Sequence, residues 1–151
     1  MIDRSLDEKI QGWIAENKEQ ILQQWIALAK IPSVQEAPQP KAPFGPECAR
    51  AVKTAAGFFE DRGIPVRINE DSGYALADLG EGEKTIGLFG HSDVVPAGDG
   101  WVMTEPFEPI IRDGALIGRG VSDNKSGVMA SLCILSMVKE LGLPLKSRLR
   151  A

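Results

Sequence analysis

The 151-residue chain contains a single histidine, His91, and only two cysteines, Cys48 and Cys133. The cysteines stand far apart and form no C-x-x-C pair, so neither a zinc knuckle nor a redox dithiol is indicated. Both fall within stretches of helical patterning, where we expect packed, free thiols. Any chemistry of this chain that needs an imidazole must therefore involve His91.

Clusters of positive charge and long apolar runs are also missing. The chain has 17 Lys and Arg against 21 Asp and Glu, a formal net charge of -4, and no basic run. Phosphate backbones are bound by basic surfaces, so we expect no nucleic-acid partner. No window is apolar for long enough to cross a bilayer, and the polar start MIDRSLDEK lacks the apolar core of a signal peptide. We expect a cytoplasmic protein without a membrane partner.

Apolar spacing and turn residues predict one domain of α/β class, with a mixed, largely parallel sheet flanked by helices. Helices are expected from residue 5 to near residue 30, from Pro46 to a stop at Gly63, and over residues 126–141. Strands are expected over residues 64–69, 74–79 and 84–89 and from residue 146 onward, with a hairpin over residues 110–117. The segment 84–89 carries Ile86, Leu88 and Phe89 and ends at Gly90, which is typical of a buried strand.

Three side chains suited to metal binding lie next to these elements. His91 and Asp93 follow the strand 84–89, and Asp123 stands in the loop before the helix 126–141. Residues two apart on an extended segment project to the same side, so Asp93 can orient the imidazole of His91. Asp123 offers a carboxylate that can bridge two ions. The spacing leaves two interpretations open, a metal site or ordinary surface and capping groups, with Asp123 as a helix N-cap.

Longer motifs around these residues resemble a known family. Residues 90–96 read GHSDVVP and residues 118–127 read GRGVSDNKSG, with Gly100-Trp101, PFEP at 106–109 and Asp113-Gly114 between them. Their order and spacing closely resemble the co-catalytic zinc peptidases that include aminoacylases, desuccinylases and carnosinase-like dipeptidases. Weaker matches at IPSV (31–34) and KELGLPL (139–145) extend the resemblance over nearly the whole chain. The segments AGDGW and ELGLPL look most like the bacterial dipeptidase branch.

The resemblance implies a role for each of the three residues. His91 would ligate one of two divalent metal ions, Asp123 would bridge both, and Asp93 would act as a catalytic residue that orients His91. Zinc is the expected metal, with manganese or cobalt as alternatives, and a cis peptide bond is expected between Asp123 and Asn124. The implied activity is hydrolysis of dipeptides by water activated between the two ions, so a small peptide is the expected substrate. A homo-oligomer is a further expectation.

The same resemblance implies that residues 1–151 are the N-terminal part of a metallopeptidase catalytic domain. In that family a pair of glutamates, a later acidic ligand, a final histidine and a smaller substrate-binding domain lie further along the chain. We therefore expect the 151-residue chain by itself to bind metal weakly or not at all, and to be inactive. Two alternatives stay open, an N-acyl amino acid deacylase of the same family and a non-catalytic binding or assembly module.

Overall fold

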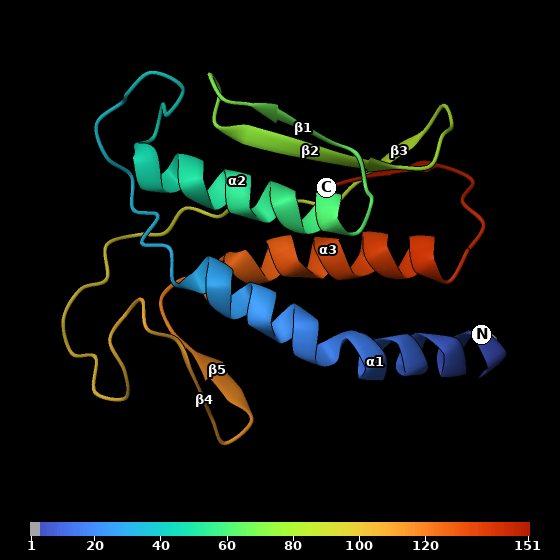
Figure 1. Cartoon of the computed structure of the whole chain (residues 1–151), viewed down its shortest axis with the longest axis horizontal. Coiled ribbons are helices and arrows are strands. Elements are labelled where there is room, and N and C mark those ends of the chain that lie inside the picture. The colour runs from blue at the N-terminus through green and yellow to red at the C-terminus, as the bar shows by residue number, and fades with distance from the viewer. Residues whose placement is uncertain (1–3) are drawn as a thin grey trace.

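The computed structural model describes residues 4–151, so the first three residues of the polar start lie outside it (Figure 1). The elements follow the predicted order, and most boundaries differ from the prediction by one or two residues. They are α1 (Arg4–Ala29), α2 (Pro46–Asp61), β1 (Val66–Asn69), β2 (Tyr74–Leu79), β3 (Thr85–Gly87), β4 (Ile110–Arg112), β5 (Ala115–Ile117), α3 (Lys125–Glu140) and β6 (Arg148–Arg150).

Four of the strands form a mixed sheet in the order β1-β2-β6-β3, while β4 and β5 form a separate hairpin. The predicted mixed sheet with flanking helices is confirmed. Its share of parallel pairing is smaller than expected, because β1 with β2 and β2 with β6 are antiparallel, and β3 with β6 is parallel. A short turn joins β1 to β2, and strands joined in this way must run antiparallel.

The helices α2 and α3 lie between the sheet and α1 (Figure 1). Their apolar faces form the core with residues from the loops and strands on either side. The buried cluster contains Leu28, Ile31, Ala51, Ala55, Phe59, Ile64, Ala77, Met129, Leu132, Leu135 and Leu149. Both cysteines are free, as predicted. Within residues 4–151 no helix combines the length and the hydropathy that crossing a bilayer requires.

The prediction that strand 84–89 is buried is wrong. Ile86 in β3 is 53% exposed, and Phe89 just beyond the strand is 92% exposed. The reason is the position of β3, which is the outermost strand of the sheet and pairs only with β6 among the described strands. A few apolar side chains in a short segment cannot by themselves distinguish an edge strand from a central one.

Polar contacts fasten the three helices together at the far end of α3 from Asp123. Trp13 of α1 donates a hydrogen bond from Nε1 to Glu140 at 2.7 Å. Arg62, which follows α2, donates from Nη1 to the other oxygen of the same carboxylate at 2.9 Å. These contacts bind the carboxyl end of α3 both to α1 and to the segment after α2.

Candidate metal centre

A close contact between two backbones places His91 beside the start of α3. A Cβ atom on Gly90 would lie 2.6 Å from the backbone N of Val128 and 2.8 Å from the carbonyl carbon of Gly127. A side chain at this position would therefore collide with the first turn of α3, and glycine permits the approach. The residue after Gly90 is thereby brought next to Asp123, which precedes the same helix.

The structure brings together all three side chains that the sequence singled out. The Nδ1 atom of His91 lies 3.2 Å from Oδ1 of Asp93 and 3.2 Å from the backbone oxygen of Asp93. The Nε2 atom lies 3.3 Å from Oδ1 of Asp123. The three side chains are 52%, 59% and 89% exposed, in chain order. His91 therefore stands between two carboxylates at an open surface.

The interpretation of Asp123 as a helix N-cap is not supported. The N-cap of α3 is Asn124, and no side-chain capping hydrogen bond is made there. The carboxylate of Asp123 instead faces His91 and solvent. The peptide bond between Asp123 and Asn124 is cis, as the resemblance implies.

The donor set fits one side of a metal site. In the tautomer that donates from Nδ1 to Asp93, the lone pair of Nε2 faces the carboxylate of Asp123, and a cation between the two would be bound by both. Ligand bonds of about 2.0–2.2 Å at the tetrahedral angle place two donor atoms about 3.3–3.6 Å apart, and the observed separation is 3.3 Å. Within residues 4–151, however, no group of three or more His, Cys, Asp or Glu side chains could hold an ion.

Buried hydrogen bonds hold the segment that carries His91 and Asp93. The Ser33 side chain is fully buried and donates from Oγ to the backbone oxygen of Ser92 at 2.5 Å. The backbone N of Val94 donates in turn to the oxygen of Ser33 at 2.9 Å. The loop after α1 thus fixes the residues on both sides of Asp93.

Lys125, the first residue of α3, is a buried lysine beside the site that the sequence did not predict. Its side chain is 0% exposed, and Nζ donates to the backbone oxygen of Ile31 at 2.7 Å. Burial lowers the pKa of this ammonium group to about 8. Lysine in the first turn of a helix is ordinarily exposed, so its place inside the motif 118–127 was the only signal. Lys125 ties the start of α3 to the loop that carries Ser33.

A cavity of about 400 Å³ opens beside His91 and Asp93. It extends between α2, the sheet and the first turns of α3. Much of its wall is apolar, formed by Ala55, Phe59, Ala75, Leu88, Val128 and Ala151 among others. No sequence pattern predicted this space, because its walls come from segments that are far apart in the chain.

Comparison with known proteins shows which family and which relatives the chain is similar to. Residues 87–151 match Peptidase family M20/M25/M40. The putative dipeptidase YtjP of Bacillus subtilis is 33% identical over 91% of this chain and 30% of its own length. The succinyl-diaminopimelate desuccinylase of Zymomonas mobilis is 49% identical over 43% of this chain and 17% of its own. Among solved structures, human carnosine dipeptidase 1 matches 95% of this chain and 33% of its own, with a TM-score of 0.75 and 28% identity.

The fold is of α/β class, and the resemblance to a peptidase family that was predicted from the sequence is confirmed. The residues 87–151 that match Peptidase family M20/M25/M40 contain His91, Asp93 and Asp123. Members of this family are generally metal-dependent. The chain spans about a third or less of the length of the relatives that it matches.

Proposed function

We propose that this chain is the N-terminal part of the catalytic domain of a metal-dependent dipeptidase. The observation that carries the proposal is the placement of His91 between the carboxylates of Asp93 and Asp123, inside a segment that matches a peptidase family. The choice of dipeptides is supported by relatives whose names are putative dipeptidase and carnosine dipeptidase. A small peptide is accordingly the proposed substrate.

Each of the three residues has a distinct task in this proposal. His91 would hold a divalent ion through Nε2, and Asp123 would hold the same ion while bridging to a second, with zinc as the proposed metal. Asp93 keeps the Nδ1 proton in place, which leaves Nε2 free as a ligand. When bound, such a pair of ions supplies Lewis acidity toward a peptide carbonyl and lowers the pKa of water.

The donor count of residues 4–151 leads to a second part of the proposal. A closed zinc site has about four protein ligands, whereas here one imidazole and one carboxylate face each other. We therefore expect the 151-residue chain alone to hold near-zero zinc after dialysis and to leave dipeptides intact. Metal analysis by mass spectrometry of the dialysed chain measures the first, and tightly held zinc would contradict it.

The test compares residues 1–151 with the complete product of the gene that encodes them. In the presence of zinc, manganese or cobalt, the complete protein should hydrolyse a dipeptide, and a chelator should abolish the activity. If the complete protein leaves dipeptides intact, or if chelation has no effect on hydrolysis, the proposal is wrong.

An N-acyl amino acid deacylase is a second candidate. It is favoured by the desuccinylase of Zymomonas mobilis, which is 49% identical over 65 residues. Rates measured with a dipeptide and with an N-acetylated or N-succinylated amino acid separate the two candidates, because a deacylase should prefer the acyl substrates. A non-catalytic module would hydrolyse none of them. A cytoplasmic location and a homo-oligomer stay predictions of the sequence.

A further inference from the structure

One short loop is bonded to both halves of the candidate metal centre. The loop 31–34 follows α1, and two of its residues, Ile31 and Ser33, are buried. Ser33 makes hydrogen bonds to the segment 92–94, whereas Ile31 accepts a hydrogen bond from Lys125 at the start of α3. The two halves of the site, which come from distant parts of the sequence, therefore share one buried support.

The first connection holds the segment that follows His91. Ser33 donates from Oγ to the backbone oxygen of Ser92 at 2.5 Å and accepts the backbone N–H of Val94 at 2.9 Å. Val34 and Val94 also form an isolated parallel bridge between the two backbones. Because His91 comes directly before this segment, the same bonds restrain the position from which its imidazole leaves the backbone.

The second connection holds the turn that carries Asp123. The side chain of Lys125 donates from Nζ to the backbone oxygen of Ile31 at 2.7 Å. The backbone N–H of Lys125 donates to the oxygen of Gly120 at 3.1 Å. Asp123 lies between these two residues in the chain. The turn 120–125 is therefore closed by a backbone hydrogen bond and anchored to the loop 31–34 by the lysine side chain.

The two connections also pack against each other at Gly120. A Cβ atom on this glycine would lie 2.5 Å from Cγ1 of Val94 and 3.4 Å from Cδ of Lys125. Only glycine permits so close an approach. The turn 120–125 thus lies directly on the segment 92–94, and a shift of either one is transmitted to the other.

Such supports matter because the metal-binding side chains themselves are open to solvent. His91 is 52% exposed and Asp123 is 89% exposed, and their facing atoms lie 3.3 Å apart. Their separation is therefore set mainly by the backbones that carry them. Binding sites need their donor groups held within about 0.5 Å of the productive geometry by surrounding contacts.

We propose that Ser33 and Lys125 are positioning residues of the metal centre. By tying both halves of the site to the loop 31–34, they set the separation of His91 and Asp123 and so raise the affinity for a divalent ion. The inference rests on the proposed function, since it takes these two residues as metal ligands. It also has a consequence of its own. Breaking either connection releases one half from the other, so the effects of breaking both should not add.

The experiment measures the zinc affinity of the complete gene product by competition with a chromophoric chelator. Ser33→Ala removes the Oγ donor, and Lys125→Met removes the Nζ donor at similar side-chain length. Each variant should bind zinc on the order of tenfold more weakly than wild type, as is typical for residues that orient metal ligands. The double variant should bind about as weakly as the weaker of the two single variants.

Two matched controls separate positioning from general stability. Lys139→Met removes the lysine whose Nζ donates to the backbone oxygens of Arg62 and Gly63 at the other end of α3, at 2.6 and 2.7 Å. Ser136→Ala makes the serine change at another buried position of α3. Both controls should bind zinc as tightly as wild type, whatever stability they lose in urea unfolding.

Three results would overturn the inference. The first is wild-type zinc affinity in Ser33→Ala or in a folded Lys125→Met protein, with folding checked by circular dichroism. If Lys125→Met does not fold, Ser33→Ala alone decides. The second is an equal loss of affinity in the two controls, and the third is additive losses in the double variant. Failure of the proposed function appears elsewhere, because wild type itself would then bind no zinc or leave dipeptides intact.

Discussion

Replacement of Gly90 by alanine should separate the His91 segment from α3 and destabilise the protein. The added Cβ would lie 2.6 Å from the backbone N of Val128 and 2.8 Å from the carbonyl carbon of Gly127. Both atoms belong to the helix backbone, so no change of rotamer relieves the contact. To reach ordinary contact, which begins at 3.4 Å, the two segments must move apart. Overpacking of this kind costs about 1–3 kcal/mol.

Urea and thermal unfolding followed by circular dichroism measure this cost. For a chain of this size about 1 kcal/mol corresponds to a fall in Tm of about 2–4 °C. The matched control is Gly12→Ala in α1, where an added Cβ meets nothing within 4 Å. That variant should be more stable than wild type by about 0.5–1 kcal/mol, because alanine favours the helix. A Gly90→Ala protein as stable as wild type would refute the reasoning.

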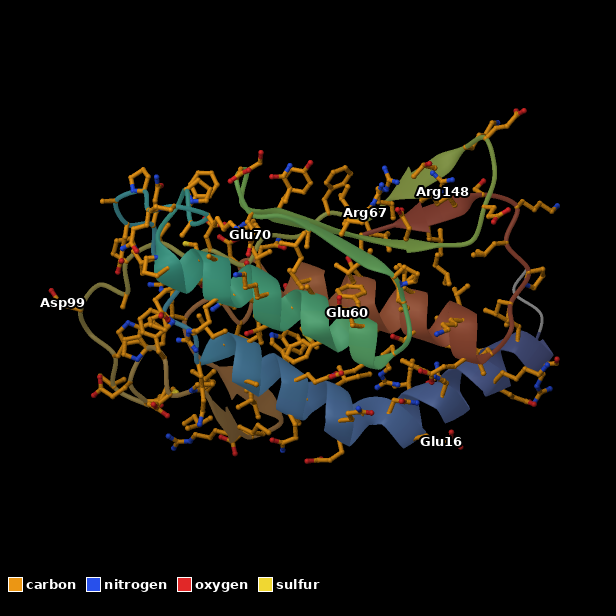
Figure 2. The ribbon with its side chains drawn as sticks, turned by 45° about the horizontal axis from the view of Figure 1, so that its top comes forward. Glu16, Glu60, Arg67, Glu70, Asp99 and Arg148 are labelled. Carbon is orange, nitrogen blue, oxygen red and sulfur yellow. The ribbon has the colours of Figure 1, made fainter. Side chains whose placement is uncertain are left out.

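Two further predictions concern the sheet and the core. Hydrogen bonds from Arg150, together with the nearby positive charges, hold the pKa of Asp78 below its usual range. This stabilisation is present above the unfolded-state pKa and is lost as pH falls through the lowered folded-state pKa. Asp78→Asn should therefore cost about 1 kcal/mol at pH 7 and progressively less below about pH 4. The control Asp99→Asn, on a loop that projects away from the helices (Figure 2), should change the free energy of unfolding by less than about 0.5 kcal/mol. An Asp78→Asn protein that loses equal stability at pH 7 and at pH 2 would contradict the role of the ion pair. Leu135→Ala, at a fully buried position, should lower the free energy of unfolding measured in urea by about 2–5 kcal/mol. The control Val102→Ala, at a position 91% exposed, should be close to neutral. Similar losses of stability for both variants would contradict the described core.

Local signals predicted most of the fold. Pro46 and Gly63 bracket α2 because proline suits the first helical position and glycine suits the residue after the end. The exposure of β3 could not be predicted, since it depends on which strands lie on either side of it. The same holds for the share of parallel pairing, which is fixed by how β6 enters between β2 and β3.

The site was predictable where it rests on motifs and unpredictable where it rests on packing. The spacing of His91 and Asp93, and the position of Asp123 before α3, indicated three side chains that come together in space. Their metal-binding roles stay predictions. The burial of Lys125 depends on the approach of the Ile31 loop to α3, and the cavity depends on walls from segments distant in sequence. Neither the burial of Lys125 nor the cavity produces a periodic pattern in the sequence.

The most direct test of the proposed activity is the rate of dipeptide hydrolysis by the complete gene product, measured with zinc for wild type and for His91→Ala. Loss of a metal ligand should lower kcat/KM by at least about a hundredfold, while the control Asp99→Asn keeps the wild-type rate. If His91→Ala hydrolyses the dipeptide as fast as wild type, His91 does not hold the catalytic metal, and the account given for this site is wrong.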